Sequence, residues 1–349
     1  MADSIFPGLP AGKPILIAGP CSAESYEQLL ETAKGLQIEL GLTLFRAGAW
    51  KPRTSPGSFE GFGEEALEWL RRLKKETGLL VGTEIGNASH ARLALSYGMD
   101  FVWIGTRTTG SPFAVEEIAA ALQGSDIAVF VKNPMAPDLD LWAGAIGRLL
   151  THGIKRVGAI LRGFYVGGER ALRNLPFWHL SEEFRTKIPA SVPLICDPSH
   201  IAGKAELLPS VIREAGLREM DGLIIETHAH PECALTDRAQ QITPHELAEI
   251  LRGTTPDGDM PELARLRGLL DKIDEEVIRL LRERFAMTDE IGEWKAFHSL
   301  TPHQEEREKE LYETRKETAK LYNVSPELAE QLFKLIHAHA LSRQEKGLK

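Results

Sequence analysis

A short stretch of the chain combines three cationic side chains with a hydroxyl group. Arg46, Lys51, Arg53 and Thr54 lie within nine residues, directly after an apolar run. Arginine offers a planar pair of N–H donors that matches phosphate or carboxylate, whereas lysine supplies a compact, movable charge. An isolated Lys-x-Arg is usually only a solvated basic loop. In a chain with a formal net charge of −9, this stretch predicts a binding site for phosphorylated ligands.

Further cations follow other apolar runs of the first 253 residues. A set of side chains that converges on one end of the predicted sheet comprises Arg46, Lys51, Arg53, Arg107, Lys132 and Arg162. Without partners, these charges would repel one another and destabilise the fold. They therefore indicate ligands that carry several negative charges.

Four potential metal ligands come from the same part of the chain. They are a thiol, an imidazole and two carboxylates, namely Cys21, His200, Glu226 and Asp237. Each alone is more often a structural residue, but together they follow the first, seventh and eighth predicted strands, which are neighbours in a closed barrel. This mixture of ligands suits a divalent transition ion and does not separate manganese, iron, cobalt and zinc.

The elements that must position these residues alternate between strands and helices. Apolar, β-branched runs predict strands at Ile15–Ala18, Leu42–Arg46, Leu79–Thr83, Phe101–Ile104, Ile127–Lys132, Val157–Leu161, Val192–Cys196 and Gly222–Ile225. Apolar residues at helical spacing predict helices at Ser25–Leu40, Gly63–Glu76, Ala88–Tyr97, Pro112–Leu122, Leu139–His152 and Lys204–Ala215. Eight such units favour a (β/α)₈ barrel of the α/β class over residues 1–253. A doubly wound open sheet is the alternative, although no Gly-x-Gly-x-x-Gly follows the first strand.

A polar segment rich in proline and glycine, residues 254–259, separates this region from a different one. Residues 260–349 have no strand pattern, and an apolar stripe predicts one long helix over about Pro261–Phe297. Start signals at Thr301–Gln304 and Ser325–Pro326 predict two more helices. Three helices of this size cannot bury their apolar stripes within one copy, so we expect an all-α, three-helix domain that dimerises through the long helix, with higher assembly left open.

Composition excludes several classes of protein. The sequence pI is near 5.7 and there is no basic tract, which argues against nucleic acid as the partner. No apolar run approaches the roughly 18 residues of a membrane span, and a signal-peptide pattern is absent. The three cysteines are too few and scattered for a disulfide framework, so a reducing cytoplasm is the expected location.

Six stretches resemble the type I 3-deoxy-D-arabino-heptulosonate 7-phosphate (DAHP) synthases, in the family's order across residues 12–253. They are Gly19–Glu24, Arg46–Pro56, Gly105–Thr108, Leu161–Gly163, Asp197–His200 and Gly222–Glu226. The 3-deoxy-octulosonate 8-phosphate synthases share the barrel, but they carry a Lys-Ala-Asn-Arg-Ser type of sequence where this chain has Lys51-Pro52-Arg53-Thr54. This loop therefore favours erythrose 4-phosphate over arabinose 5-phosphate. Thr106 departs from the alanine that is common before the arginine.

The resemblance implies condensation of phosphoenolpyruvate with erythrose 4-phosphate, with release of phosphate. Lys51 and Lys132 would be catalytic. Phosphoenolpyruvate would contact Arg46, Lys51, Arg107, Lys132 and Arg162, held in place by Glu84. Erythrose 4-phosphate would contact Lys51, Pro52, Arg53 and Thr54. A divalent metal, Mn²⁺ ahead of Fe²⁺, Co²⁺ or Zn²⁺, would act as a Lewis acid on Cys21, His200, Glu226 and Asp237.

Residues 260–349 resemble the all-helical chorismate mutases, which convert chorismate to prephenate. The resemblance implies a pocket for this dicarboxylate formed by Arg284, Lys295, Arg307, Glu308 and Gln344, with Arg267 supplied by the partner chain. Lys295 and Gln344 would be catalytic, by stabilising charge on the breaking ether oxygen. Gln304 and Ala340 depart from the aspartate and serine that are common at these positions.

Three hypotheses follow. The leading one is a bifunctional shikimate-pathway enzyme. In the second, the helical domain is a non-catalytic sensor that dimerises the chain, and in the third the barrel is a metal-dependent aldolase for another sugar phosphate. About 13 residues precede the first strand, where many relatives carry a regulatory domain. We therefore expect prephenate or chorismate to inhibit the synthase through the helical domain.

Overall fold

The computed structural model describes residues 5–6, 14–51, 57, 59–167, 171–253, 260–301, 303 and 305–347. Among these, side chains are not described for residues 260–269, 271–272, 275–276, 305 and 345–347. The chain divides into two compact units, residues 1–257 and residues 258–349.

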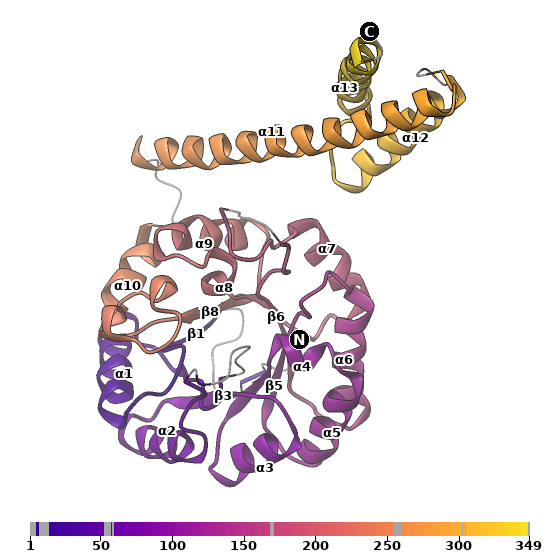
Figure 1. Ribbon diagram of the computed structural model, residues 1–349. Coiled ribbons are helices and arrows are strands. Elements are labelled where there is room, and N and C mark those ends of the chain that lie inside the picture. Colours follow the sequence, from indigo (N-terminus) through magenta and orange to yellow (C-terminus); the bar gives the residue numbers. More distant parts are fainter. Residues whose placement is uncertain are drawn as a thin grey trace. The chain divides into compact units, whose positions relative to one another are not determined.

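The first unit is a closed barrel of parallel strands, which confirms the predicted (β/α)₈ fold and excludes an open sheet (Figure 1). Its strands in the described residues are β1 (Ile15–Gly19), β2 (Leu44–Arg46), β3 (Leu80–Ile85), β4 (Phe101–Ile104), β5 (Ala128–Lys132), β6 (Val157–Leu161), β7 (Leu194–Cys196) and β8 (Gly222–Glu226). Each strand pairs with the next along the chain, and β1 pairs with β8 from Ile15↔Gly222 to Gly19↔Glu226. The carboxyl ends of all strands therefore meet at one end of the barrel.

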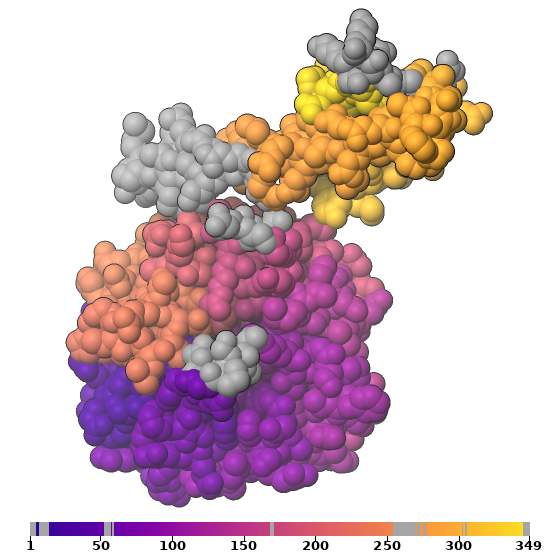
Figure 2. Space-filling model, in the orientation of Figure 1, coloured from indigo at the N-terminus to yellow at the C-terminus, as the bar shows by residue number. Residues whose placement is uncertain are grey.

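Helices form a ring around the strands, and their side chains fill the spaces between neighbouring helices (Figures 1 and 2). They are α1 (Tyr26–Leu40), α2 (Glu64–Thr77), α3 (Ala88–Ser96), α4 (Thr106–Thr109), α5 (Pro112–Leu122), α6 (Leu139–Thr151), α7 (Trp178–Lys187), α8 (Pro198–Ala202), α9 (Leu208–Leu217) and α10 (Pro244–Gly253). Side-chain caps fix several starts, as where Ser25 accepts from the N–H of Gln28 and Asp138 from that of Leu141. The predicted Lys204–Ala215 helix is instead a 3₁₀ turn at Ala205–Leu207 followed by α9. Pro209 lies in the first turn of α9 because it lacks the N–H that a helix interior requires.

Apolar side chains fill the barrel near the amino ends of its strands. Phe6 is 1% exposed, and its ring packs edge-on against Phe101 and stacks on Phe130. Phe101 begins β4 and Phe130 lies in β5. Polar chemistry is consequently confined to the opposite end, where the strands finish.

Gly19 allows β1 and β2 to approach each other at that polar end. Its φ is +144°, and a Cβ added there would lie 2.1 Å from the carbonyl oxygen of Arg46. Any other residue would force the strands apart. The glycine therefore helps to bring Cys21, which follows β1, beside Arg46, which ends β2.

The second unit is all helical, as predicted. It contains α11 (Met260–Phe297), α12 (Glu305–Leu321) and α13 (Pro326–Gly347). Ser325 caps α13 by accepting from the N–H of Leu328 at 3.2 Å. The predicted start of α12 falls partly on Pro302 and Gln304, which lie outside the described residues. Among the described helices, none is long and apolar enough to cross a membrane.

Candidate active sites

Three of the four predicted metal ligands lie together at the carboxyl end of the barrel. One ligand atom from each of Cys21, Glu226 and Asp237 lies within 4.8 Å of the others. The Cys21 Sγ donates to Asp237 Oδ2 at 3.2 Å, and both Cys21 and Glu226 are fully buried. This set fits a divalent transition ion, because a thiolate and carboxylates are ligands that such ions accept.

His200, the fourth predicted ligand, lies next to this group. Its Nε2 is 3.8 Å from Glu226 Oε1, and its Nδ1 is 2.8 Å from Asp197 Oδ2. Burial lowers the pKa of His200, against the opposing charge of Asp197. The lowered pKa favours the neutral ring, which is the form that ligates metals, and Asp197 lies beside its Nδ1.

Burial also affects the pKa values of two neighbouring groups, the thiol of Cys21 and the carboxylate of Asp237. It raises the pKa of the Cys21 thiol, and the charge of Glu226 raises it further against the effect of Lys51. Burial acts in the same direction on Asp237, but the charges of His200 and Arg173 outweigh it and hold the pKa of Asp237 well below its usual range. A carboxylate and a thiol thus face each other, ready to exchange the thiol proton for a metal ion.

Cations from β2 and β5 face these acidic groups. Arg46 Nη2 lies 3.1 Å from Glu226 Oε1, and Lys132 Nζ lies 2.9 Å from Asp197 Oδ2. Both pairs are nearly inaccessible to water. Burial raises the pKa of Asp197, but the charges of His200 and Lys132 outweigh this effect and hold the pKa well below its ordinary range. Asp197 therefore faces Lys132 as a carboxylate.

Arg46 retains donor capacity that the described residues do not use. It is 1% exposed, and its Nε and Nη1 have no hydrogen-bond partner within the described part of the chain. Its guanidinium carbon lies 4.9 Å from the ring centre of Trp103. Buried donors without acceptors are expensive, so these two N–H groups are suited to an anionic ligand.

Lys51 links the basic loop to the metal-ligand cluster. Its Nζ donates to the carbonyl oxygen and the Sγ of Cys21 at 3.0 and 2.9 Å. Burial lowers the pKa of Lys51, but the neighbouring charges of Cys21 and Glu226 outweigh it, so the pKa is raised. Pro52, Arg53 and Thr54, the predicted aldose-phosphate residues, lie outside the described residues.

The remaining predicted cations surround Glu84. Arg162 is 8% exposed at the end of β6, and burial lowers its pKa to about 10. Arg107 lies in α4 on the surface. Burial raises the pKa of Glu84, but Lys132 and Lys51 outweigh it, so the carboxylate is ionised. Trp103 Nε1 donates to Glu84 Oε2 at 2.8 Å and holds it among the cations.

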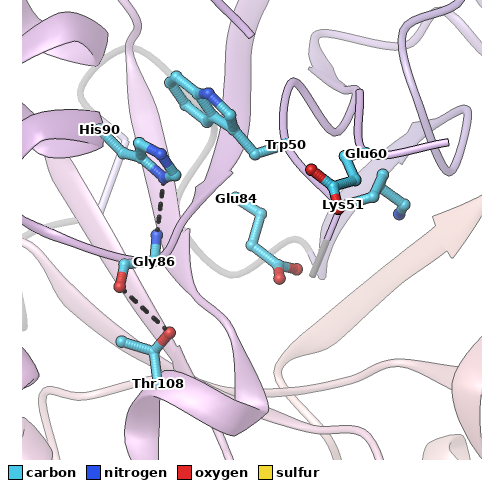
Figure 3. Close-up of a pocket in the computed structure, with 7 residues that line it drawn as sticks. All are labelled: Trp50, Lys51, Glu60, Glu84, Gly86, His90 and Thr108. Atoms are coloured by element: carbon cyan, nitrogen blue, oxygen red, sulfur yellow. Dashed lines mark hydrogen bonds between the residues drawn. The ribbon is translucent and has the colours of Figure 1, made fainter. Parts of the chain in front are cut away.

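A pocket of about 280 Å³ opens beside Lys51 and Glu84 (Figure 3). Its other wall is Trp50, whose ring stacks face to face on His90 with centres 3.9 Å apart. His90 Nδ1 accepts from the N–H of Gly86 at 3.3 Å. Trp50 precedes Lys51 directly, so the stack fixes the start of the basic loop.

Sequence reasoning missed side chains that hold the predicted ones. Gln240 bonds Glu226, Arg173 bonds Asp237, and Asn133 Oδ1 accepts from the N–H of Arg162 at 2.7 Å. Asn133 and Gln240 follow Lys132 and Asp237 closely in sequence, so proximity to predicted residues was an available signal. Arg173 lies far from any predicted residue in sequence, and only the fold brings it here.

In the helical unit, Arg284, Lys295 and Glu308 lie around His337. Burial lowers the pKa of His337, Glu308 raises it, and Arg284 and Lys295 lower it. Glu308 accepts from Tyr312 Oη at 2.6 Å and lies 2.7 Å from His303 Nε2. Burial and Glu308 together raise the pKa of Tyr312 to about 12.

Two buried atoms in this unit have no hydrogen-bond partner within the described residues, Arg284 Nη1 and Gln344 Oε1. Gln344 Nε2 donates to the carbonyl of Thr288 at 2.6 Å, which ties α13 to α11. Arg307 is exposed and pairs with Glu310 on its own helix, so it does not join the others here. The Arg267 side chain lies outside the described residues. A pocket of about 510 Å³ in this unit includes Glu308 but not the other four predicted residues whose side chains are described.

In comparisons with known proteins, two parts of the chain match two different families. The DAHP synthetase I family matches residues 9–259, and chorismate mutase type II matches residues 266–345. The boundary between these matches falls near the predicted linker.

Individual relatives resemble the barrel. A phospho-2-dehydro-3-deoxyheptonate aldolase of Thermotoga maritima is 33% identical over 227 residues, which are 65% of this chain and 64% of that protein. A 2-dehydro-3-deoxyphosphooctonate aldolase of Helicobacter pylori is 29% identical over 68% of this chain and 93% of its own length. The crystal structure of a Thermotoga maritima DAHP synthase superposes with a TM-score of 0.63 at 29% identity, covering 74% of this chain and 71% of that one.

Proposed function

The chain belongs to the DAHP synthetase I family, and from that premise we propose that its barrel condenses phosphoenolpyruvate with erythrose 4-phosphate. The observation that carries the proposal is Arg46, a buried cation with two unused N–H donors beside a cluster of potential metal ligands. An anionic substrate would complete its hydrogen bonding. A reaction that needs no metal would leave the cluster of ligand atoms without a function. An uncharged substrate would leave the two Arg46 donors without an acceptor.

The cations at the strand ends would bind and align two reactants that repel each other. Arg46, Arg162 and Lys132 would neutralise the phosphate and carboxylate of phosphoenolpyruvate, while Lys51 would bridge towards the aldehyde. Asp197 and Glu226 keep Lys132 and Arg46 in place through the ion pairs described above. The low exposure of this group restricts the access of bulk water to the reacting atoms.

The bonds that change are those of a condensation with phosphate release. C3 of phosphoenolpyruvate would form a bond to the aldehyde carbon, water would add to C2, and the C2–O bond to inorganic phosphate would break. Cys21, His200, Glu226 and Asp237 would hold a divalent metal, with Mn²⁺ the first candidate. When bound, the metal would supply Lewis acidity at the aldehyde oxygen.

The condensation is tested by phosphate release from the two substrates, before and after a chelator removes metal. We expect release that disappears on chelation and returns with Mn²⁺. Arabinose 5-phosphate in place of erythrose 4-phosphate is the control for the aldose, and it should react poorly. Absence of release with metal restored would refute the synthase assignment, and preference for arabinose 5-phosphate would refute the choice of aldose.

For the helical unit, we infer a second activity, the rearrangement of chorismate to prephenate. Arg284 and Gln344, with their unused buried atoms, would contact the substrate together with Lys295 and Glu308. The reaction needs no proton transfer, so charge stabilisation at the ether oxygen is the main requirement. Loss of chorismate absorbance on addition of the full chain tests this activity. If chorismate binds but is not consumed, the alternative of a non-catalytic sensor holds instead.

We further propose that prephenate or chorismate inhibits the condensation through the helical unit, which would couple two separate sites. The test is phosphate release with increasing prephenate, on the intact chain and on chain cut by protease near Pro256. Cutting should abolish inhibition while release continues. Equal inhibition of cut and intact chain would contradict the coupling.

The proposed dimer rests on the apolar face of α11. Leu270, Ile273, Val277 and Leu280 are 47% to 58% exposed within one copy, whereas side chains of this kind are normally covered in a folded protein. A second copy of the same face would cover them. Sedimentation should give twice the chain mass for the wild type and a monomer for Ile273→Glu. The control that should stay dimeric is Ile38→Glu, at an exposed isoleucine of α1.

A further inference from the structure

Gln240 uses both ends of its amide on charged partners. It is 1% exposed, its Nε2 donates to Glu226 Oε2 at 2.6 Å, and its Oε1 accepts from Arg173 Nη1 at 2.7 Å. A carboxylate only accepts and a guanidinium only donates, so the amide can lie in one orientation alone. The side chain is therefore a fixed connector between Arg173 and Glu226.

The nitrogen of Arg173 that contacts Gln240 also binds the carboxylate of Asp237. This nitrogen, Nη1, donates to Asp237 Oδ1 at 3.1 Å. The other oxygen of Asp237 faces the Sγ of Cys21, and the other oxygen of Glu226 faces His200 and Arg46. Each carboxylate thus has one oxygen held by the Arg173–Gln240 pair and one oxygen turned towards the cluster of ligand atoms.

The backbone of Asp237 also needs a restraint. Its φ of +45° and ψ of 37° lie in the left-handed region, which a residue with a Cβ keeps only where the surroundings impose it. The bonds from Arg173 and Cys21 hold both oxygens of this side chain. The backbone carbonyl of Asp237 also accepts from the N–H of Gln240 at 3.1 Å, so contacts to side chain and backbone together favour this conformation.

We propose that Arg173 and Gln240 are positioning residues that orient Glu226 and Asp237 for metal binding. The proposal rests on the metal-dependent synthase function inferred above. Bonds of this kind to ligating carboxylates typically contribute 10- to 100-fold, as a rough guide, to metal affinity. Arg173 comes from the loop after β6 and Gln240 from the loop after β8, so the pair also ties two loops together, and the test must separate these roles.

Metal affinity of the full chain gives that separation. Cd²⁺ binding is followed by the charge-transfer absorbance of its bond to the Cys21 thiolate, and Mn²⁺ binding by the loss of the free-ion electron paramagnetic resonance signal. Gln240→Met keeps length and removes both hydrogen bonds, while Gln240→Glu keeps the acceptor for Arg173 but presents an oxygen to Glu226. We expect both to weaken binding by about 10- to 100-fold.

Arg173→Met is the second variant, because its side chain is 46% exposed and its loss leaves no buried hole. It should weaken binding similarly, and Arg173→Lys should recover part of the affinity. The matched control is Arg185→Met, which removes an arginine of 36% exposure that pairs with Asp221 on the same unit. The control should bind both metals as the wild type does, with its thermal unfolding measured alongside.

Each outcome is decisive. Unchanged affinity in Gln240→Met and Arg173→Met would overturn the positioning role while leaving the synthase proposal intact. Lowered unfolding temperature with unchanged metal affinity would reduce the pair to a structural tie. A wild-type chain that binds neither metal would overturn the metal-dependent function itself, and the inference with it.

Discussion

Lys132 and Asp197 form the ion pair with the largest consequences at the scale of single residues. Their side chains are 3% and 0% exposed, so neither charge has water as an alternative partner. Removing one charge leaves the other buried without compensation, which is typically much more costly than the pair is favourable. The pair therefore matters for stability mainly because the loss of either partner would leave a buried, uncompensated charge.

Asp197→Asn should lower the free energy of unfolding by about 3–5 kcal/mol. Asparagine keeps the Oδ1 that caps α8 by accepting from the N–H of His200, so the lost charge is the main change. The control is Asp140→Asn, which breaks an exposed pair with Lys187 and should cost less than about 1 kcal/mol. Urea unfolding of the two variants measures the difference, and equal losses would contradict the argument.

His90 makes a contribution to the stability of the fold that depends on pH. Burial lowers its pKa below the ordinary value, so the folded chain holds it neutral while the unfolded chain takes up a proton as the pH falls below about 6.5. Its contribution to stability is therefore present at neutral pH and declines in acid. Between about pH 7.5 and pH 5.5, wild type should lose more unfolding free energy than His90→Phe, which keeps a ring on Trp50. Parallel losses in the two proteins would refute this reading.

The types of the metal ligands in the candidate site could be predicted from the sequence, but the hydrogen bonds that hold these ligands could not. Cys21, Glu226 and Asp237 were chosen as metal ligands by type and by position after strands, and they do lie together. The roles of Gln240 and Arg173 could not be assigned from sequence, because the role of an amide or a guanidinium depends on which carboxylate it contacts. That depends on two loops whose paths the hydrophobic pattern does not encode.

At the scale of elements, Gly292 in α11 leaves room for the side chain of Gln344 in α13. A Cβ added there would lie 2.8 Å from Cγ of Gln344, closer than real contacts allow. The glycine weakens the helix by up to about 1 kcal/mol relative to alanine. Its retention in a helix interior is explained by the space that Gln344 occupies.

Gly292→Ala should displace Gln344 and lower chorismate turnover by roughly 10- to 100-fold, the value of a hydrogen bond to developing charge. Stability should stay level or rise, because alanine favours the helix. Gly144→Ala in α6, where an added Cβ meets nothing within 4 Å, is the control and should leave turnover unchanged. Unaltered turnover in Gly292→Ala would show that Gln344 has no part in the reaction.

Strands were predictable from sequence to within two residues at each end, because β-branched runs buried on both faces leave a plain pattern. The predicted Lys204–Ala215 helix begins too early, because residues 205–207 form a 3₁₀ turn and α9 begins only at Leu208, with Pro209 in its first turn. The link between residues 254 and 259 lies outside the described residues. Periodicity thus predicts that a helix is present, and Pro209 marks where α9 begins.

At the scale of the whole molecule, the two candidate sites belong to separate units and should fail separately. Lys295→Ala should reduce chorismate turnover by about 10²- to 10³-fold, as expected for loss of one charge-stabilising donor, and leave phosphate release unchanged. Lys320→Ala, which breaks an exposed pair with Glu317, should alter neither activity. A parallel loss of both activities in Lys295→Ala would mean that the units act as one.

The closure of the barrel also bears on how the chain is made. Strand β1 completes its pairing only with β8, roughly 200 residues later, which a ribosome needs about 10–40 s to synthesise. Throughout that interval the nascent chain carries the Cys21 thiol without Glu226 and Asp237, the acidic groups that lie against it in the finished barrel. Binding of the proposed metal would therefore have to wait until β8 and Asp237 have been synthesised, and a bound ion would then tie the first strand to the last.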